Sequence, residues 1–188
     1  MIFSWTVVVN HFDGSGEFTR TWDEYKTGFG DAGGEAWLGN EYLHYLTSTR
    51  SYKLRFDLED WDGNTAYAEY SSFRVTSEDD KYRLLLGDYS GNASDDAADD
   101  RSLGFSHHNN SRFSTQNEDN DNYDTVNCAQ QHSLNPGWYR ACLSVNPTAN
   151  YCPTSSCGDK GRRLMWQAWT GWSYSLKTMK MMMRPVDY

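Results

Sequence analysis

Long apolar runs, C-x-x-C cysteine pairs and an excess of positive charge are all missing from this chain of 188 residues. No stretch approaches the roughly 18 apolar residues that a membrane-spanning helix needs, so no membrane span is expected. Without C-x-x-C spacing, a structural zinc site is not expected either. The net charge of −9 and the pI near 4.9 argue against nucleic acid or an anionic membrane surface as the main partner.

Signatures of catalysis are missing as well. The sequence has no nucleophile elbow, zinc motif or phosphate loop. The five histidines show no recognisable spacing with Ser or Asp; they are His11, His44, His107, His108 and His132. His107 and His108 fall in a polar stretch. We therefore expect a binding protein and not an enzyme.

A secretory leader is also missing from the start of the chain, "MIFSWTVVVN", which has no basic region and only a short apolar stretch. This start is typical of a fragment, or of a chain to which Met1 was added. Two N-x-[ST] sequons, at Asn92 and Asn109, nevertheless agree with secretion and predict N-glycosylation.

The four cysteines that are present lie in the C-terminal part, at Cys128, Cys142, Cys152 and Cys157. An even, clustered count predicts two disulfides and hence an oxidising, extracellular compartment. The sequence alone permits three pairings.

Local patterns predict the first elements. "WTVVV" (Trp5–Val9) is a β-branched run that favours a strand. Thr21 and Glu24 stand in the spacing of a capping box, which begins a short helix that Gly28 and Gly30 end. A second short helix is expected from Asn40.

From Tyr52 the hydrophobic period changes to two, and Leu54, Phe56 and Leu58 share one face of a predicted strand. "DGN" at 62–64 predicts a hairpin turn. The stretches "TAYAEYSSFRV" and "KYRLLLGDY" continue as strands, and "WSYSLKTMKMMMRP" reads as the last strand, with Met181–Met183 in packing roles. The fold class is therefore α+β, with a central antiparallel sheet and a loop-rich C-terminal lobe.

Residues 90–128 are polar and rich in Asp, Asn and Ser. Nearly 40 residues exceed an ordinary connection, so this segment is either functional or held by something other than a core. "SDDAADD" (Ser94–Asp100) has no ligand periodicity and favours a solvated loop.

The stretch "QNEDNDNYDTVNC" (Gln116–Cys128) has two interpretations. Asp119, Asp121, Tyr123 and Thr125 stand two residues apart, so two carboxylates and two backbone carbonyls can face one cation, with water completing the oxygen shell that Ca²⁺ prefers. The loop is no EF-hand. A solvated acidic loop fits the same residues, and the spacing leaves both interpretations open.

Most of the chain resembles one family, the fibrinogen C-terminal domain, and in particular its ficolin, tachylectin and microfibril-associated glycoprotein members. The matching stretches are, in the family's order, WTVVVNHFDGSGEFTRTWDEYKTGFG, GEAWLGNEYLHYLT, LRFDLEDWDGNTAYAEYSSFRV, YRLLLGDYSGNA, RFSTQNEDNDNY, NCAQQ, GWYRACLSVN and MWQAWTGWSYSLKTMKMMMRP. The resemblance implies one fibrinogen-like domain over 1–188, with the sheet in about 1–90, a calcium- and ligand-binding lobe in about 91–175 and a final strand in about 172–185. It also implies that the family's N-terminal subdomain is missing.

By the same resemblance, Ca²⁺ is bound by the side chains of Asp119 and Asp121 and the carbonyls of Tyr123 and Thr125. Cys128 pairs with Cys142, and an unusual cis peptide falls at Ala141–Cys142. Cys152 and Cys157 have no counterpart in the family, and we predict that they pair with each other.

The family's ligand pocket lies beside the calcium loop, and its positions here are His132, Trp138, Tyr139, Ala141, Cys142, Leu143 and Lys160. Acetyl-binding members carry a His where this chain has Leu143, and Leu cannot donate a hydrogen bond to an acetamide. Trp138 and Tyr139 either line the pocket or pack as core aromatics against the disulfide. Lys160, Arg162 and Arg163 form either an anion-binding patch or a solvated cluster.

Two functions follow. The first is a secreted, calcium-binding, lectin-like module of innate immunity that recognises carbohydrate or acetylated surface ligands. The second is an extracellular protein-interaction module, binding a matrix or receptor protein, without a sugar pocket. Family members form oligomers through segments N-terminal to this domain, so oligomers are expected only through such segments.

Overall fold

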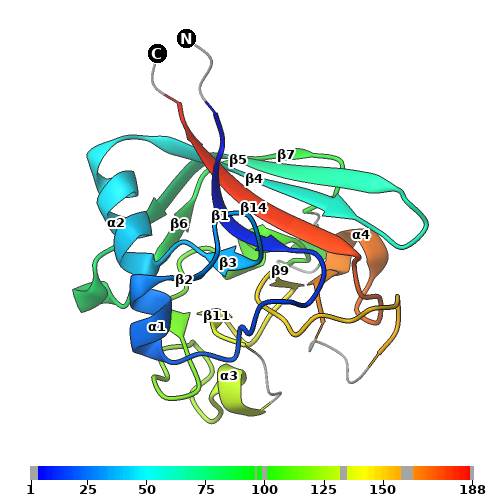
Figure 1. Cartoon of the computed structure of the whole chain (residues 1–188). Coiled ribbons are helices and arrows are strands. Elements are labelled where there is room, and N and C mark those ends of the chain that lie inside the picture. Colours follow the sequence, from blue (N-terminus) through cyan, green and yellow to red (C-terminus); the bar gives the residue numbers. More distant parts are fainter. Residues whose placement is uncertain (1–3, 96, 99–100, 132–134, 158–162, 187–188) are drawn as a thin grey trace.

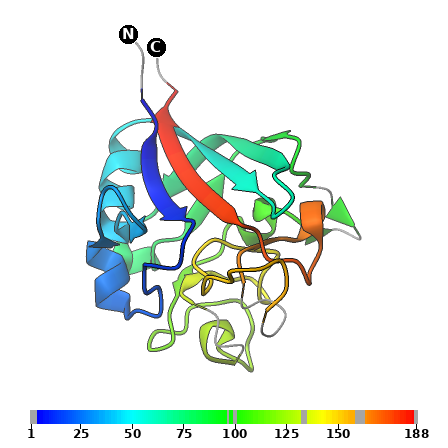
Figure 2. The same cartoon turned by 45° about the vertical axis from the view of Figure 1, so that its right-hand side comes forward.

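A computed structural model gives the structure of the chain and describes residues 4–95, 97–98, 101–131, 135–157 and 163–186 (Figure 1). A twisted antiparallel sheet forms the upper part of the molecule. The loop-rich lobe, which comes from the second half of the chain, lies beneath it in both views (Figure 2). None of the described helices has the length and apolar character needed to span a bilayer.

The sheet has eight strands, in the order β2-β3-β1-β14-β4-β5-β6, with β7 pairing with β5 as well. Its strands are β1 (Thr6–His11), β2 (Phe29–Gly30), β3 (Ala36–Trp37), β4 (Tyr52–Glu59), β5 (Thr65–Val75), β6 (Leu84–Leu86), β7 (Tyr89–Gly91) and β14 (Thr178–Pro185). The last strand therefore lies between the first strand and β4, and its pairing brings the two ends of the chain together at one edge of the molecule (Figure 1).

Two helices pack against this sheet. Helix α1 (Trp22–Thr27) begins at the predicted capping box, in which Thr21 and Glu24 bond each other's backbone, and it ends at Gly28. Helix α2 (Asn40–Thr49) packs on β5, where the hydroxyl of Thr47 accepts a hydrogen bond from the Val75 N–H at 3.0 Å. Both predicted helices are confirmed.

The lobe contains only short elements. Those that the structure describes are the helical turn η2 (Phe105–His108), the helices α3 (Cys128–Gln131) and α4 (Gln167–Thr170), and the strands β8 (Ala97–Ala98), β9 (Arg101–Ser102), β10 (Phe113–Ser114), β11 (Gly137–Trp138), β12 (Val145–Asn146) and β13 (Met165–Trp166). A further helical turn, η1 (Glu78–Asp80), connects β5 to β6. The described strands of the lobe pair in three two-stranded ladders. The lobe must therefore obtain its stability from packing against the sheet.

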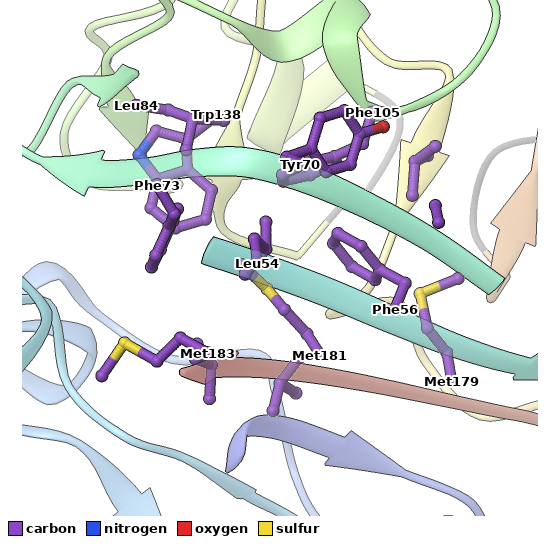
Figure 3. Packing of buried hydrophobic residues seen from close by; sticks show 14 of the residues in the cluster. Leu54, Phe56, Tyr70, Phe73, Leu84, Phe105, Trp138, Met179, Met181 and Met183 are labelled. Atoms are coloured by element: carbon purple, nitrogen blue, oxygen red, sulfur yellow. The ribbon is translucent and has the colours of Figure 1, made fainter. Parts of the chain in front are cut away.

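The core lies between the inner face of the sheet and the lobe (Figure 3). Leu54 and Phe56 of β4 alternate with polar neighbours, as predicted, and are fully buried. Met179, Met181 and Met183 of β14 lie beside them on the same face. The flexible thioether side chains fill the space between the aromatic rings.

Two segments in the middle of the chain show more than the sequence pattern indicated. In the stretch "KYRLLLGDY" the first strand begins only at Leu84, because Lys81 and Tyr82 have φ angles of 58° and 50°, in the left-handed region where an extended strand cannot continue. The stretch then forms two short strands, β6 and β7, which are separated by Gly87 and Asp88. The polar segment 90–128 is held by the core after all, since Phe105 and Phe113 are buried at 1% and 0% exposure.

The alternation of buried and outward-facing side chains on β14 gives a first testable prediction. Met181→Ala removes a fully buried side chain and is expected to lower the free energy of unfolding by about 2–5 kcal/mol, measured from denaturant midpoints. Lys180→Ala, its neighbour on the outer face, is the matched control and should change stability by no more than about 0.5 kcal/mol. Equal losses in the two variants would contradict the assignment of the faces.

Candidate functional site

The loop that precedes α3 presents the four predicted calcium ligands. Asp121 is half-buried, whereas Asp119, Tyr123 and Thr125 are exposed. One Asp121 oxygen, Oδ1, accepts a hydrogen bond from the Tyr123 N–H and the other, Oδ2, accepts from the Cys128 N–H, both at 2.8 Å. The same carboxylate therefore orders the loop and fixes its end at the first cysteine of a disulfide.

The electrostatics of Asp121 suit a cation. Burial raises the pKa of its carboxyl group, the hydrogen bonds from Cys128 and Tyr123 oppose that rise, and the negative charge of Asp119 adds to it. Two carboxylates this close repel each other unless a cation lies between them. Among the described residues, no cluster of three or more His, Cys, Asp or Glu side chains forms a metal site. A metal here would thus need backbone carbonyls and water to complete its shell, which is the chemistry of Ca²⁺.

Two disulfides close the lobe. Cys128 is bonded to Cys142, with their Cα atoms 5.5 Å apart, and Cys152 is bonded to Cys157. The Ala141–Cys142 peptide is cis, as expected. The Asn122 N–H donates to the Arg140 carbonyl at 3.0 Å, so the acidic loop and the segment before the second cysteine lie side by side.

Three of the described residues that were predicted to line a ligand pocket are buried. Trp138, Tyr139 and Leu143 are only 3%, 2% and 5% exposed. Tyr139 and Leu143 pack with Cys128, Ala129 and Met165 in a small second core, and Cys142 is partly buried against it.

The polar atoms of the two aromatic side chains are already used. The Trp138 indole N–H donates to the Tyr82 carbonyl at 2.7 Å, and the Tyr139 hydroxyl donates to the Asn135 carbonyl. Ala141 is exposed, whereas His132 and Lys160 lie outside the described residues. The expected cationic patch is also corrected in part: Arg163 is 3% exposed and donates to the Ser173 carbonyl, and Arg162 is outside the described residues.

His108, placed in a polar stretch by the sequence, is instead a buried structural residue. Its Nδ1 lies 2.6 Å from the Trp138 carbonyl, which can only accept, so Nδ1 donates. Its Nε2 then accepts from the N–H groups of Ser144 and Val145, at 3.2 and 3.1 Å. Burial lowers the pKa of His108 to about 3, with a further contribution from His107, so the ring stays neutral and joins three segments of the lobe.

Glu35 is a second structural residue that the sequence did not reveal. Its carboxylate accepts hydrogen bonds from His11 Nδ1 at 2.7 Å and from four backbone groups. Those four are the N–H groups of Phe12, Asp13, Gly14 and Gly16. His11 Nε2 lies 2.6 Å from the Ala149 carbonyl, so both ring nitrogens face acceptors. The pair joins the end of β1 to the lobe.

A twisted antiparallel sheet with a disulfide-closed lobe and an acidic loop before the first cysteine of its larger bridge defines a fibrinogen-like globular domain. The sequence model of the C-terminal globular domain of fibrinogen beta and gamma chains matches residues 3–186, and the chain belongs to this family.

Individual relatives point to a subgroup. Human fibrinogen-like protein 1 is 39% identical over 98% of this chain and 60% of its own length, and human angiopoietin-related protein 7 is 40% identical over 98% and 50%. The solved fibrinogen-like globe domain of human ANGPTL2 superposes with a TM-score of 0.89, at 40% identity, over 97% of this chain and 81% of that one. The chain thus spans only about half to three fifths of these curated relatives. The family expected from the sequence is confirmed, whereas the ficolin and tachylectin subgroup is not the one these relatives represent.

The Glu35 contacts give a second prediction. Burial alone would raise the pKa of Glu35, but the bonds from His11 and the backbone hold it well below its usual value. Because the folded-state pKa is depressed, the stabilisation is fully present above the unfolded value of about 4.3 and is lost as the pH falls below it. Glu35→Gln removes the charge of a buried carboxylate to which His11 and four backbone N–H groups donate, and should cost about 3–5 kcal/mol at about pH 7.

The measurement is the urea midpoint of the unchanged chain and of Glu35→Gln, at about pH 7 and at about pH 3. The difference between the two midpoints should be smaller at the lower pH. Asp31→Asn, an exposed carboxylate in the same connection, is the control and should change stability by no more than about 0.5 kcal/mol. A difference that stays constant across this range would contradict the ionised Glu35.

Proposed function

We propose that this chain is a secreted, calcium-dependent protein-interaction module, and not a lectin. The observation that carries the proposal is the burial of Trp138, Tyr139 and Leu143, together with the use of the Trp138 N–H and the Tyr139 O–H as donors within the described part of the chain. The likeness to fibrinogen-like protein 1 and to angiopoietin-related protein 7 supports it. The two disulfides support an oxidising, extracellular location.

The partner would dock on the exposed surface beside the acidic loop. Tyr123 is 43% exposed there, and Arg140 and Ala141 are exposed on the neighbouring segment, to which the loop is bonded. Tyr and Arg are the residue types that contribute most to protein interfaces. Calcium would hold this surface in shape through Asp119, Asp121 and the carbonyls of Tyr123 and Thr125, and it would serve binding instead of catalysis.

The third prediction concerns the metal. Calcium at about 100 times its Kd adds about 2.7 kcal/mol to stability, which corresponds to a rise in Tm of roughly 5–10 °C for a domain of this size. Asp119→Asn and Asp121→Asn should abolish the rise, because each removes one of two carboxylate ligands. Asp124→Asn, an exposed acid in the same loop, should retain it. A rise of equal size in all three variants would show that calcium binds elsewhere.

The fourth prediction concerns the partner. The purified chain is applied, in calcium, to an array of cell-surface and matrix ectodomains and to an array of acetylated and anionic glycans. We expect protein hits and no glycan hits. Tyr123→Ala, which keeps the ligand carbonyl, and Arg140→Ala should each weaken a hit by about 2 kcal/mol, roughly thirtyfold in Kd.

Tyr45→Ala is the matched control, since Tyr45 is 64% exposed but lies on α2, away from the lobe (Figure 1). Calcium-dependent glycan binding without a protein hit would overturn the proposal in favour of the lectin.

A further inference from the structure

The two sequons differ in what their asparagine side chains do. Asn92 and Asn109 are both exposed, and both accept a hydrogen bond on Oδ1 from a backbone N–H group. The two amide nitrogens differ. In a glycosylated asparagine, the sugar carbon replaces the Nδ2 hydrogen on the same side as Oδ1, because secondary amides are trans.

In Asn109, the Nδ2 hydrogen on the same side as Oδ1 is used in a hydrogen bond. Its Oδ1 accepts from the Leu86 N–H at 2.9 Å, and its Nδ2 donates to the carbonyl of the same residue at 3.5 Å. A two-point contact with one residue uses the amide edge that holds Oδ1 and the hydrogen beside it. A sugar at Asn109 would therefore occupy the place of the Leu86 carbonyl and break the contact between the end of η2 and β6.

In Asn92, the Nδ2 hydrogen on the same side as Oδ1 is available for a sugar to replace. Its backbone N–H donates to the Tyr67 carbonyl at 3.0 Å, and its Oδ1 accepts from the Tyr67 N–H at 2.8 Å. These two bonds fix the amide at the end of β7, directly beside β5. Within the described part of the chain, Nδ2 makes no hydrogen bond, so a substituent on it breaks none.

Asn92 also stands at the wall of a groove of about 610 Å³ on the outer face of the sheet. The groove is lined mainly by polar side chains, among them Arg55, Asp57, Thr65 and Tyr67. Tyr67 is 37% exposed, and the Arg55 guanidinium lies 4.4 Å from the centre of its ring. Planar polar groups and an aromatic side chain suit the hydroxyl groups and apolar faces of sugars.

We propose that Asn92 carries an N-linked glycan whose first sugars lie over this groove, and that Asn109 is unmodified in the folded protein. The inference rests on the secretion proposed above. A glycan at this position would cover the outer face of the sheet and leave the surface beside the acidic loop free for a partner.

The test expresses the chain behind a signal peptide in eukaryotic cells, so that it meets the glycosylation machinery wherever it is naturally located. Peptide N-glycosidase converts each glycosylated Asn to Asp, and peptide mass mapping reads both sites. We expect conversion at Asn92 only. Ser94→Ala should remove the glycan while leaving the Asn92 side chain in place, and Ser111→Ala should change nothing. Conversion at Asn109, or none at Asn92, would overturn the assignment.

Ser111→Ala is a suitable control because the Ser111 hydroxyl is fully buried and has no hydrogen-bond partner among the described residues, so its loss should not impair folding. Oxidative labelling then tests the position of the sugars. Tyr67 should be labelled several-fold less in the glycosylated protein than in Ser94→Ala, whereas Tyr45 should be labelled equally in both. Equal labelling of Tyr67 would place the sugars away from the groove. Partner binding by Ser94→Ala tests the proposed function separately, since that binding does not need the glycan.

Discussion

Trp138 is the side chain on which the joint between sheet and lobe depends. Its ring packs against Phe113 and Phe105 of the lobe and against Trp37 of β3, with ring centres 5.2, 6.4 and 5.8 Å away. Its only polar atom is satisfied by the Tyr82 carbonyl. A lobe built from two-residue strands has little stability of its own, so aromatic packing of this kind keeps it on the sheet.

The aromatic packing around Trp138 determines which side chains of the lobe a ligand can reach. The side chains that fix the lobe are unavailable to a ligand, and His108 and the Cys128–Cys142 bridge hold the backbone around them. The acidic loop and the segment next to it, including Tyr123 and Arg140, remain exposed. A rigid base with exposed tyrosine and arginine on one surface suits recognition of another protein better than enclosure of a small sugar.

The sequence predicted what local periodicity encodes. The alternation of Leu54, Phe56 and Leu58 and the capping box at Thr21 depend on neighbours a few residues away, and both appear in the structure. His108 and Glu35 were missed because their partners are far along the chain: Ser144 is 36 residues from His108, and His11 is 24 from Glu35. No local pattern marks such contacts, so a buried histidine in a polar stretch resembles a solvated one.

For the site, too, the sequence predicts only what depends on neighbouring residues. The spacing of Asp119 and Asp121 is local, so the residues by themselves indicate a cation loop as one of two interpretations. Whether Trp138 lines a pocket or the core depends on the sheet that packs against it, and here the packing assigns it to the core. The family resemblance therefore predicted the fold correctly, but it did not decide whether Trp138 and Tyr139 line a pocket or pack in the core.

The most direct test of this account is a ¹H–¹⁵N spectrum of the chain in the presence of calcium, titrated to saturation with N-acetylated sugars. We predict that the Trp138 indole N–H exchanges slowly with solvent, because it is buried and bonded to the Tyr82 carbonyl. We also predict that its signal does not shift when the sugar is added. A saturable shift of that signal, lost when calcium is removed, would show that Trp138 lines a sugar pocket and would contradict the account.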